Sequence, residues 1–324
     1  MEFRTTFNCE PSSYKISHQQ KFITAGSCFA DVVGQRLTAN KFRVLVNPFG
    51  NIYNPISLHT LLAQDSREPS LLDHAFVERG GIWYNHHLHA AYSALTKDDL
   101  FKKIESAFKA FHDWIQEADW LIITYGTSWI YERVVEKDIV ANCHKMPSSY
   151  FKKRLLDDHE TFSSFADLHS RLASLNPKLR IIVTVSPVRH IKDTLPLNNV
   201  SKSILRVACH KLTQQYENVS YFPSYELMMD DLRDYRFYKT DMIHPTADAE
   251  NYIWEKFCDV YFNHDTKNFI ANWANITAAL KHKAFYPQSD DHQQFLRYTL
   301  KKLEAFAASV DVSDEVATIK QQLL

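Results

Sequence analysis

Short apolar runs alternate with longer amphipathic segments along most of this chain. The apolar runs, each long enough for a buried strand, cover residues 22–25, 43–46, 120–125, 180–186 and 219–222. Between them, apolar residues recur at helical spacing in segments 29–37, 56–62, 100–115, 151–172 and 204–212. This alternation predicts a parallel sheet with helices on both faces, which is a doubly wound α/β domain. In such sheets the ligand crevice lies beyond the carboxyl ends of the strands.

The pattern changes near residue 263. Beyond this point the strand pattern stops, and the chain is polar with helical spacing, most clearly over residues 293–324. At 324 residues the chain is long enough for one large domain and an appendage. We therefore expect a main domain over residues 1–263. The remaining residues, 264–324, are expected to form a helical C-terminal extension that packs on this domain or mediates homo-oligomer formation.

Charge and composition argue against several classes of protein. Lys and Arg number 37 against 38 Asp and Glu, a net charge of −1, so the charge balance does not favour nucleic acid or an anionic membrane as partner. No apolar run reaches the roughly 18 residues of a membrane span, and residues 1–8 lack the order of a secretory signal. The five cysteines are scattered and form no C-x-x-C pair, which is typical of a reduced chain. We expect a cytoplasmic protein.

A small-residue turn follows the first apolar run. Gly26, Ser27 and Cys28 end the expected strand and open the expected helix, so two candidate nucleophiles stand at one strand end. A nucleophile there gains from the helix dipole and from free backbone N–H groups that can bind an oxyanion. On its own, the same tripeptide is more typical of a helix cap with Cys28 as a small buried residue.

A second motif lies about 215 residues further along. Asp241 stands three residues before His244, and Pro245 then begins an expected amphipathic helix. An Asp at this distance can bind one imidazole nitrogen and leave the other facing a nucleophile. Together the two motifs supply the nucleophile, base and base-orienting group that covalent acyl transfer needs.

The chain also resembles a known family. Residues 26–30 read G-S-C-F-A, the motif that gives the GSCFA family its name, and similar blocks occur at residues 47–55, 125–131, 141–147, 186–190 and 221–245. The resemblance spans roughly residues 20–262. This family is placed among the SGNH (GDSL-like) hydrolases. The resemblance implies a three-layer α/β/α fold with flavodoxin-like strand order and serine-esterase-like chemistry. The mechanism we expect requires no cofactor.

The resemblance assigns roles to several residues. Asp241 and His244 match the last SGNH block, and Gly50 matches the oxyanion glycine of the second. In the third block the family pattern has an oxyanion-binding Asn where this chain has Ser128, in the sequence Gly-Thr127-Ser128. A hydroxyl can still donate a hydrogen bond, or Asn51 or Asn54 can substitute for the missing amide.

The nucleophile itself has two candidates. Aligned on its Gly, the family block Gly-Asp-Ser maps onto Gly26-Ser27-Cys28, which puts Cys28 in the nucleophile position. A shift by one residue restores Ser27 as the nucleophile but loses the glycine. A thiol beside a His at a helix N-terminus is readily activated, whereas ester hydrolases of this kind mostly use Ser. The glycine-aligned register favours Cys28.

Further polar residues, in a histidine-rich loop or after predicted strands or turns, are candidates for binding substrate. They are His89, Asn142, His144 and Arg189, of which Arg189 is best suited to an anionic or polyhydroxylated group because its planar fork binds bidentately. The aromatic residues in 235–238 either form a wall of the site or belong to the core. His86, His87 and His89 lack the accompanying ligand spacing of a zinc site, so we expect a polar loop and no metal.

These observations favour an acyl ester hydrolase that acts on an O-acylated carbohydrate or another small acyl ester. Cys28 or Ser27 would attack the carbonyl, His244 would act as base, and backbone N–H groups at Cys28 and Gly50 would bind the oxyanion. Two alternatives stay open. The same residues would support acyl transfer to an acceptor hydroxyl or amine, and the departure at Ser128 would also fit a catalytically silent binding protein.

Overall fold

A five-stranded parallel sheet forms the centre of the fold in a computed structural model, which describes residues 7–64 and 70–324. The strands are β1 (Lys21–Gly26), β2 (Arg43–Val46), β6 (Trp120–Tyr125), β10 (Arg180–Val185) and β11 (Val219–Tyr221). They lie in the order β11-β10-β6-β1-β2. Counted among the sheet strands alone, this is the flavodoxin-like order 2-1-3-4-5. The predicted doubly wound sheet is confirmed, and each strand ends within one residue of its expected bounds.

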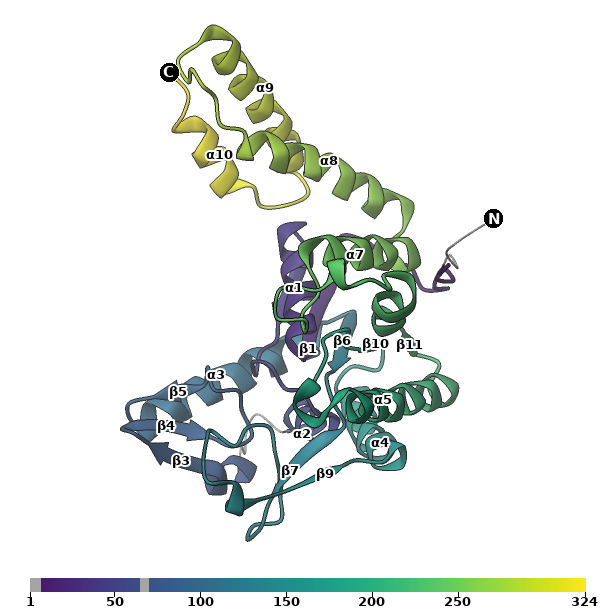
Figure 1. Cartoon of the computed structure of the whole chain (residues 1–324). Coiled ribbons are helices and arrows are strands. Elements are labelled where there is room, and N and C mark those ends of the chain that lie inside the picture. Colours follow the sequence, from purple (N-terminus) through teal and green to yellow (C-terminus); the bar gives the residue numbers. More distant parts are fainter. Residues whose placement is uncertain (1–6, 65–69) are drawn as a thin grey trace.

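Each face of the sheet carries its own hydrophobic core. Ile23 and Leu121 point to a core with helices α2 (Pro55–Ala63), α3 (Lys97–Ile115), α4 (Asp158–Leu175) and α5 (Leu195–Gln215). Phe22 and Ile122, their neighbours in sequence, point to the opposite core with α1 (Cys28–Ala39) and α7 (Ala247–Tyr261). Successive residues of each strand thus pack into opposite cores, because neighbouring side chains in a strand point to opposite faces of the sheet. The result is the expected three-layer α/β/α arrangement (Figure 1).

One predicted helix is wrong in its first part. Residues 151–172 were expected to form a single helix, but Phe151–Leu155 is strand β9 and the helix begins only at Asp158. The Asp157 carboxylate accepts a hydrogen bond from the Glu160 N–H and the Glu160 side chain bonds back to the Asp157 N–H, which closes a capping box. This cap fixes the start of α4 because it satisfies two backbone donors that a helix end leaves open.

Two small antiparallel sheets, which the sequence pattern did not predict, lie outside the main sheet. One joins β3 (Phe76–Arg79), β4 (Ile82–Asn85) and β5 (Ser93–Ala94), and the other has the order β8-β7-β9, with β7 (Trp129–Arg133) and β8 (Ile139–Val140). In Figure 1 the first projects beside α3 and the second extends from the end of β6. Short helical turns occupy Ser70–Ala75, Ser148–Tyr150, Ile191–Asp193, Ser224–Glu226, Leu227–Asp231 and Tyr235–Phe237.

The C-terminal residues form three helices with a core of their own. They are α8 (His264–Lys281), α9 (Asp290–Phe306) and α10 (Ser313–Lys320), and they share a buried cluster that includes Trp273, Leu296 and Leu303. The Trp273 indole donates a hydrogen bond of 2.8 Å to the Ala39 carbonyl at the end of α1. Figure 1 shows this unit standing away from the sheet, beyond α1 and α7. The division into domains 1–263 and 264–324 stays a prediction, which we retain as a proposal. None of the helices in the described ranges is long and apolar enough to cross a membrane.

The turn after β1 generates a prediction about stability. Gly26 has a φ of +130°, and a Cβ there would lie 2.1 Å from the Thr124 carbonyl oxygen of β6. Gly26→Ala should therefore lower the free energy of unfolding by roughly 3 kcal/mol or more. Gly81 is the matched control, because its φ is also positive, at +76°, but nothing lies within 4 Å of its Cβ position. Gly81→Ala should cost only about 1 kcal/mol. Urea unfolding of both variants measures the difference, and equal losses would contradict the proposed clash.

Candidate functional site

A cleft of about 510 Å³ opens where the parallel strands end. Its walls come from residues that follow β1, β6 and β10, from the small sheet of β7, and from the loop before α7. It lies where ligands bind in doubly wound sheets, beyond the carboxyl ends of the strands. The cleft residues include Cys28, Tyr53, Asn54, Thr127, Trp129, Asn142, Arg189, His190 and His244.

Ser27 and Cys28 face different surroundings. Ser27 is the N-cap of α1, is fully buried, and its hydroxyl has no hydrogen-bond partner. Cys28, the first residue of α1, is half-buried and lines the cleft together with His244. Backbone geometry explains the divergence, because neighbouring side chains at a strand-to-helix turn point in different directions. Only Cys28 is accessible to a molecule in the cleft.

The surroundings of Cys28 keep its thiol protonated at neutral pH. Burial raises the pKa of Cys28, and the nearby Asp31 carboxylate raises it further. Lys202 and the backbone N–H groups of Cys28 and Phe29 act in the opposite direction but do not outweigh burial. A resting thiolate is therefore not favoured, and nucleophilic attack by Cys28 needs a base that removes the proton during the reaction.

Asp241 holds His244 in one orientation. The Asp241 Oδ1 accepts hydrogen bonds from the backbone N–H groups of Ile243 and His244, at 2.8 and 3.0 Å. Its Oδ2 lies 2.7 Å from His244 Nδ1. These bonds keep the pKa of Asp241 well below its usual range, so the carboxylate is ionised and Nδ1 is the donor. In the neutral imidazole this leaves Nε2 as the proton acceptor.

Several residues expected to bind substrate do line the cleft: Asn54, Thr127, Asn142 and Arg189. The Asn54 amide donates to Ser57 Oγ at 3.0 Å and to the Val140 carbonyl at 3.4 Å. The Asn54 Oδ1 also accepts a hydrogen bond from the Ser57 N–H. Asn54 therefore acts mainly as the N-cap of α2. The Thr127 hydroxyl lies 3.0 Å from Ser201 Oγ, either of which can donate, and Thr127 remains the best-placed hydroxyl at the end of β6.

The other candidates lie away from the cleft walls. The Gly50 N–H donates to the Asn47 carbonyl, and Asn51 Oδ1 accepts from the Asn47 side chain. Ser128 is fully buried and bonds to Ser201, so its hydroxyl does not stand in for the missing oxyanion Asn at the cleft surface. His89 packs against Gly50, and the buried His144 Nε2 bonds to the Asn85 carbonyl at 2.8 Å.

Arg189 stands between the cleft and a second hollow. Its backbone N–H donates to the Ile243 carbonyl at 3.2 Å, so it is tied to the loop that carries His244. Its guanidinium carbon lies 3.8 Å from the centre of the Tyr238 ring and 5.6 Å from that of Tyr235. Tyr235 and Tyr238 line the second hollow, of about 320 Å³, and not the cleft itself. Tyr235 and Tyr238 therefore pack against the Arg189 side chain and do not form a wall of the cleft.

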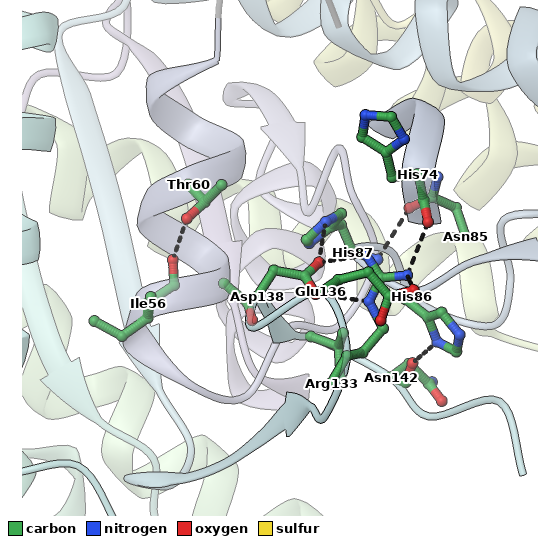
Figure 2. A network of polar contacts seen from close by, with 12 residues as sticks. Ile56, Thr60, His74, Asn85, His86, His87, Arg133, Glu136, Asp138 and Asn142 are labelled. Carbon is green, nitrogen blue, oxygen red and sulfur yellow. Dashed lines mark hydrogen bonds and ion pairs between the residues drawn. The ribbon is translucent and has the colours of Figure 1, made fainter. Parts of the chain in front are cut away.

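The histidine cluster forms a structural network behind the cleft (Figure 2). Arg133 binds Asp138 with two hydrogen bonds, of 2.6 and 2.7 Å, and His87 Nε2 lies 3.2 Å from the same carboxylate. His86 Nδ1 lies 2.9 Å from the Asn142 carbonyl, and its own carbonyl accepts the Asn142 N–H. Within the described ranges no three His, Cys, Asp or Glu side chains gather as metal ligands. The network fixes Asn142 in the cleft wall.

Lys202 is a notable residue that the sequence analysis missed. It lies in α5, is 1% exposed, and its side-chain nitrogen donates to the carbonyls of Gly126 and Ser186 at the strand ends. It also interacts electrostatically with Cys28. Its position carries a signal: Asn198, Lys202, Leu205, Cys209 and Leu212 are all buried residues of α5, spaced by three or four. A lysine on the apolar face of a helix is unusual, since lysine is almost never fully buried unless paired. The helical spacing that the sequence shows starts at residue 204, whereas α5 begins at Leu195, so Lys202 lies in the part of the helix outside that pattern.

Two carbohydrate-active enzymes are among the solved structures that match this chain. One is a carbohydrate esterase family 3 protein from Talaromyces cellulolyticus, with 7% identity, a TM-score of 0.35, and coverage of 79% of this chain and 99% of that one. The other is the acetyl xylan esterase Est2A from the rumen bacterium Butyrivibrio proteoclasticus, with 12% identity, a TM-score of 0.35, and coverage of 81% and 66%. Among curated protein sequences, none matches this chain.

Comparison with protein families matches both parts of the chain. Residues 21–257, which contain the sheet, Cys28 and the Asp241–His244 pair, match the GSCFA family. Residues 273–324, within the three C-terminal helices, match the C-terminal domain of GSCFA domain proteins. The first match alone covers most of the chain, and the chain therefore belongs to the GSCFA family.

Proposed function

We propose that this protein is an acyl ester hydrolase of the SGNH (GDSL-like) type, with Cys28, His244 and Asp241 as its catalytic residues. One observation carries the proposal: Cys28 and His244 line the same cleft, and Asp241 binds His244 through Nδ1. This provides a nucleophile, a base with a free Nε2, and a group that orients the base. The fold places the thiol at the N-terminus of α1, as acyl-transfer chemistry favours.

The proposed reaction runs in two steps. Cys28 Sγ attacks the acyl carbonyl as His244 Nε2 removes the thiol proton, and His244 then returns this proton to the departing alcohol. Water, with His244 again as base, cleaves the thioester and regenerates the thiol. The Cys28 and Phe29 N–H groups act to lower the pKa of the Cys28 thiol, and they are the proposed oxyanion donors. The Gly50 N–H expected for this role is bound to Asn47, so the Thr127 hydroxyl is the better second candidate.

The walls of the cleft suit a small polar ester, and an O-acylated carbohydrate is the substrate we favour. Tyr53 and Trp129 supply aromatic surface, while Asn142 and Arg189 supply hydrogen-bond donors. Aromatic rings beside a few convergent polar groups are common in small-molecule sites. We also propose a cytoplasmic location, because all five cysteines are unpaired, as in reducing compartments.

The base and its partner give the first test of this proposal. His244→Ala should abolish hydrolysis of p-nitrophenyl acetate, and Asp241→Asn should lower kcat by orders of magnitude, about 10⁴ in the best-studied triad. Asp248 is a matched control, because it is an exposed carboxylate in the first turn of α7, four residues beyond His244. Asp248→Asn should keep kcat within about twofold. Near-normal activity of His244→Ala would remove His244 from the mechanism.

The two neighbouring nucleophile candidates give the second test. Cys28→Ala should be inactive, and Cys28→Ser should retain weak activity. Ser27→Ala should remain active. Replacing a capping serine with alanine usually lowers the stability of a protein by roughly 1 kcal/mol. The Ser27 side chain makes no cap hydrogen bond, so we expect almost no loss of stability here. Steady-state kinetics and thermal unfolding measure both effects. Full activity of Cys28→Ala with an inactive Ser27→Ala would show that the serine attacks.

A further inference from the structure

Lys202 is buried at the point where two central strands end. Its ammonium nitrogen donates hydrogen bonds of 2.7 Å to the carbonyls of Gly126 and Ser186. These are the first residues after β6 and β10, which are neighbours in the sheet. The side chain therefore joins α5 to both strand ends and fixes the backbone on that side of the cleft.

No carboxylate forms an ion pair with Lys202 in the part of the chain described by the structure. The two carbonyls satisfy two of its N–H groups, and its nitrogen lies 5.8 Å from the centre of the Tyr225 ring. An ammonium at this depth without a counter-ion is costly, since burial strips it of water. A negative charge that forms nearby during the reaction would offset the cost of burying the charged Lys202 side chain.

The titratable groups around Lys202 identify that charge. Burial lowers the pKa of Lys202 to about 7, and Cys28 is the group whose ionisation opposes this by favouring the charged lysine. In return Lys202 acts to lower the pKa of Cys28, against burial and Asp31. His190, whose pKa burial lowers to about 3, also interacts with Lys202 and with His244 but is neutral near pH 7. Tyr53 interacts with Cys28 and Asp31 and keeps its proton, because burial raises its pKa.

We propose that Lys202 is a positioning residue for the nucleophile: it fixes the ends of β6 and β10 beside Cys28, and its buried charge stabilises the Cys28 thiolate. The inference rests on the proposed function in that it assigns Lys202 a part in activating Cys28. The thiol proton still passes to His244, and Lys202 takes part in no covalent step. It supplies a second positive charge for the thiolate, in addition to the His244 imidazolium that forms when the proton is transferred.

Alkylation of Cys28 tests this role without any need for ester turnover. Iodoacetamide reacts with the thiolate, so the rate of Cys28 modification against pH, followed by peptide mass spectrometry, reports its ionisation. Lys202→Met removes the charge and the hydrogen bonds, whereas Lys202→Gln removes the charge and keeps an amide donor. Both should slow Cys28 alkylation roughly tenfold below about pH 7, where Lys202 carries its charge, and move its profile to higher pH.

Two controls separate charge from structure. Cys143 lines the same cleft and is measured in the same digest, so its rate should not change. Lys211 lies on the same helix with its side chain 50% exposed, so Lys211→Met should leave the Cys28 profile unchanged. An unchanged Cys28 profile in folded Lys202→Met would overturn the proposal. If the alkylation rates of Cys28 and Cys143 change in parallel, or if Lys202→Gln alone alkylates at the normal rate, the role of Lys202 is purely structural and the proposed charge effect is wrong.

A second measurement covers the case in which neither variant folds. Lysine labelled with ¹⁵N allows the charge of Lys202 to be followed by NMR in the unchanged protein and in Cys28→Ser. In the unchanged protein Lys202 should keep part of its charge while Cys28 ionises, since the two groups titrate as a pair. In Cys28→Ser it should lose its charge at lower pH. Identical titrations would overturn the proposal, whereas a coupled pair in an inactive protein would refute only the hydrolase assignment.

Discussion

The site depends on the close approach of β1 and β6 at Gly26. A side chain at Gly26 would overlap the Thr124 carbonyl oxygen, so only glycine allows β1 to end so close to β6. The Gly26 N–H donates to Asn47 Oδ1 at 2.9 Å, and the Ser27 N–H donates to Thr124 O at 2.9 Å. These contacts fix the direction in which the chain leaves the sheet. As a consequence, α1 begins with Cys28 at the edge where β6 and β10 also end.

The cleft combines groups that are held by different kinds of interaction. Asp241 and His244 are more than 40% exposed, and hydrogen bonds within four residues of sequence set their geometry. Cys28 and Lys202, in contrast, are placed by the packing of helices on the sheet. The exposed pair can therefore be altered with little effect on the core. A change at Lys202 has a larger structural effect, because it removes the hydrogen bonds that join α5 to the ends of β6 and β10.

Much of the fold was readable from the sequence because the central strands are buried on both faces and appear as unbroken apolar runs. Strand β9 was not, since Phe151 and Leu155 are four residues apart, a spacing that fits a helix as well as one face of a strand. The Asp241–His244 pair was readable because it is local in sequence. The roles of Ser128 and Lys202 were not, because their hydrogen bonds join segments that only the folded chain brings together. Gly50 was misassigned because its N–H closes a local turn to the Asn47 carbonyl, and the sequence pattern does not show this bond.

The attachment of the C-terminal helices to the far end of α1 affects how the protein can be shortened. Trp273 binds the Ala39 carbonyl, and Lys41 just beyond α1 forms an ion pair of 2.7 Å with Glu315. A fragment limited to residues 21–257 would contain every residue of the cleft. It would lack Trp273 and Glu315, and with them both of these contacts, and it would also lack the parallel β-bridge between Ile16 and Phe262. The last turn of α1 would then fray into water while its first turn still presented the thiol. Shortening at this boundary would thus loosen the helix that carries Cys28.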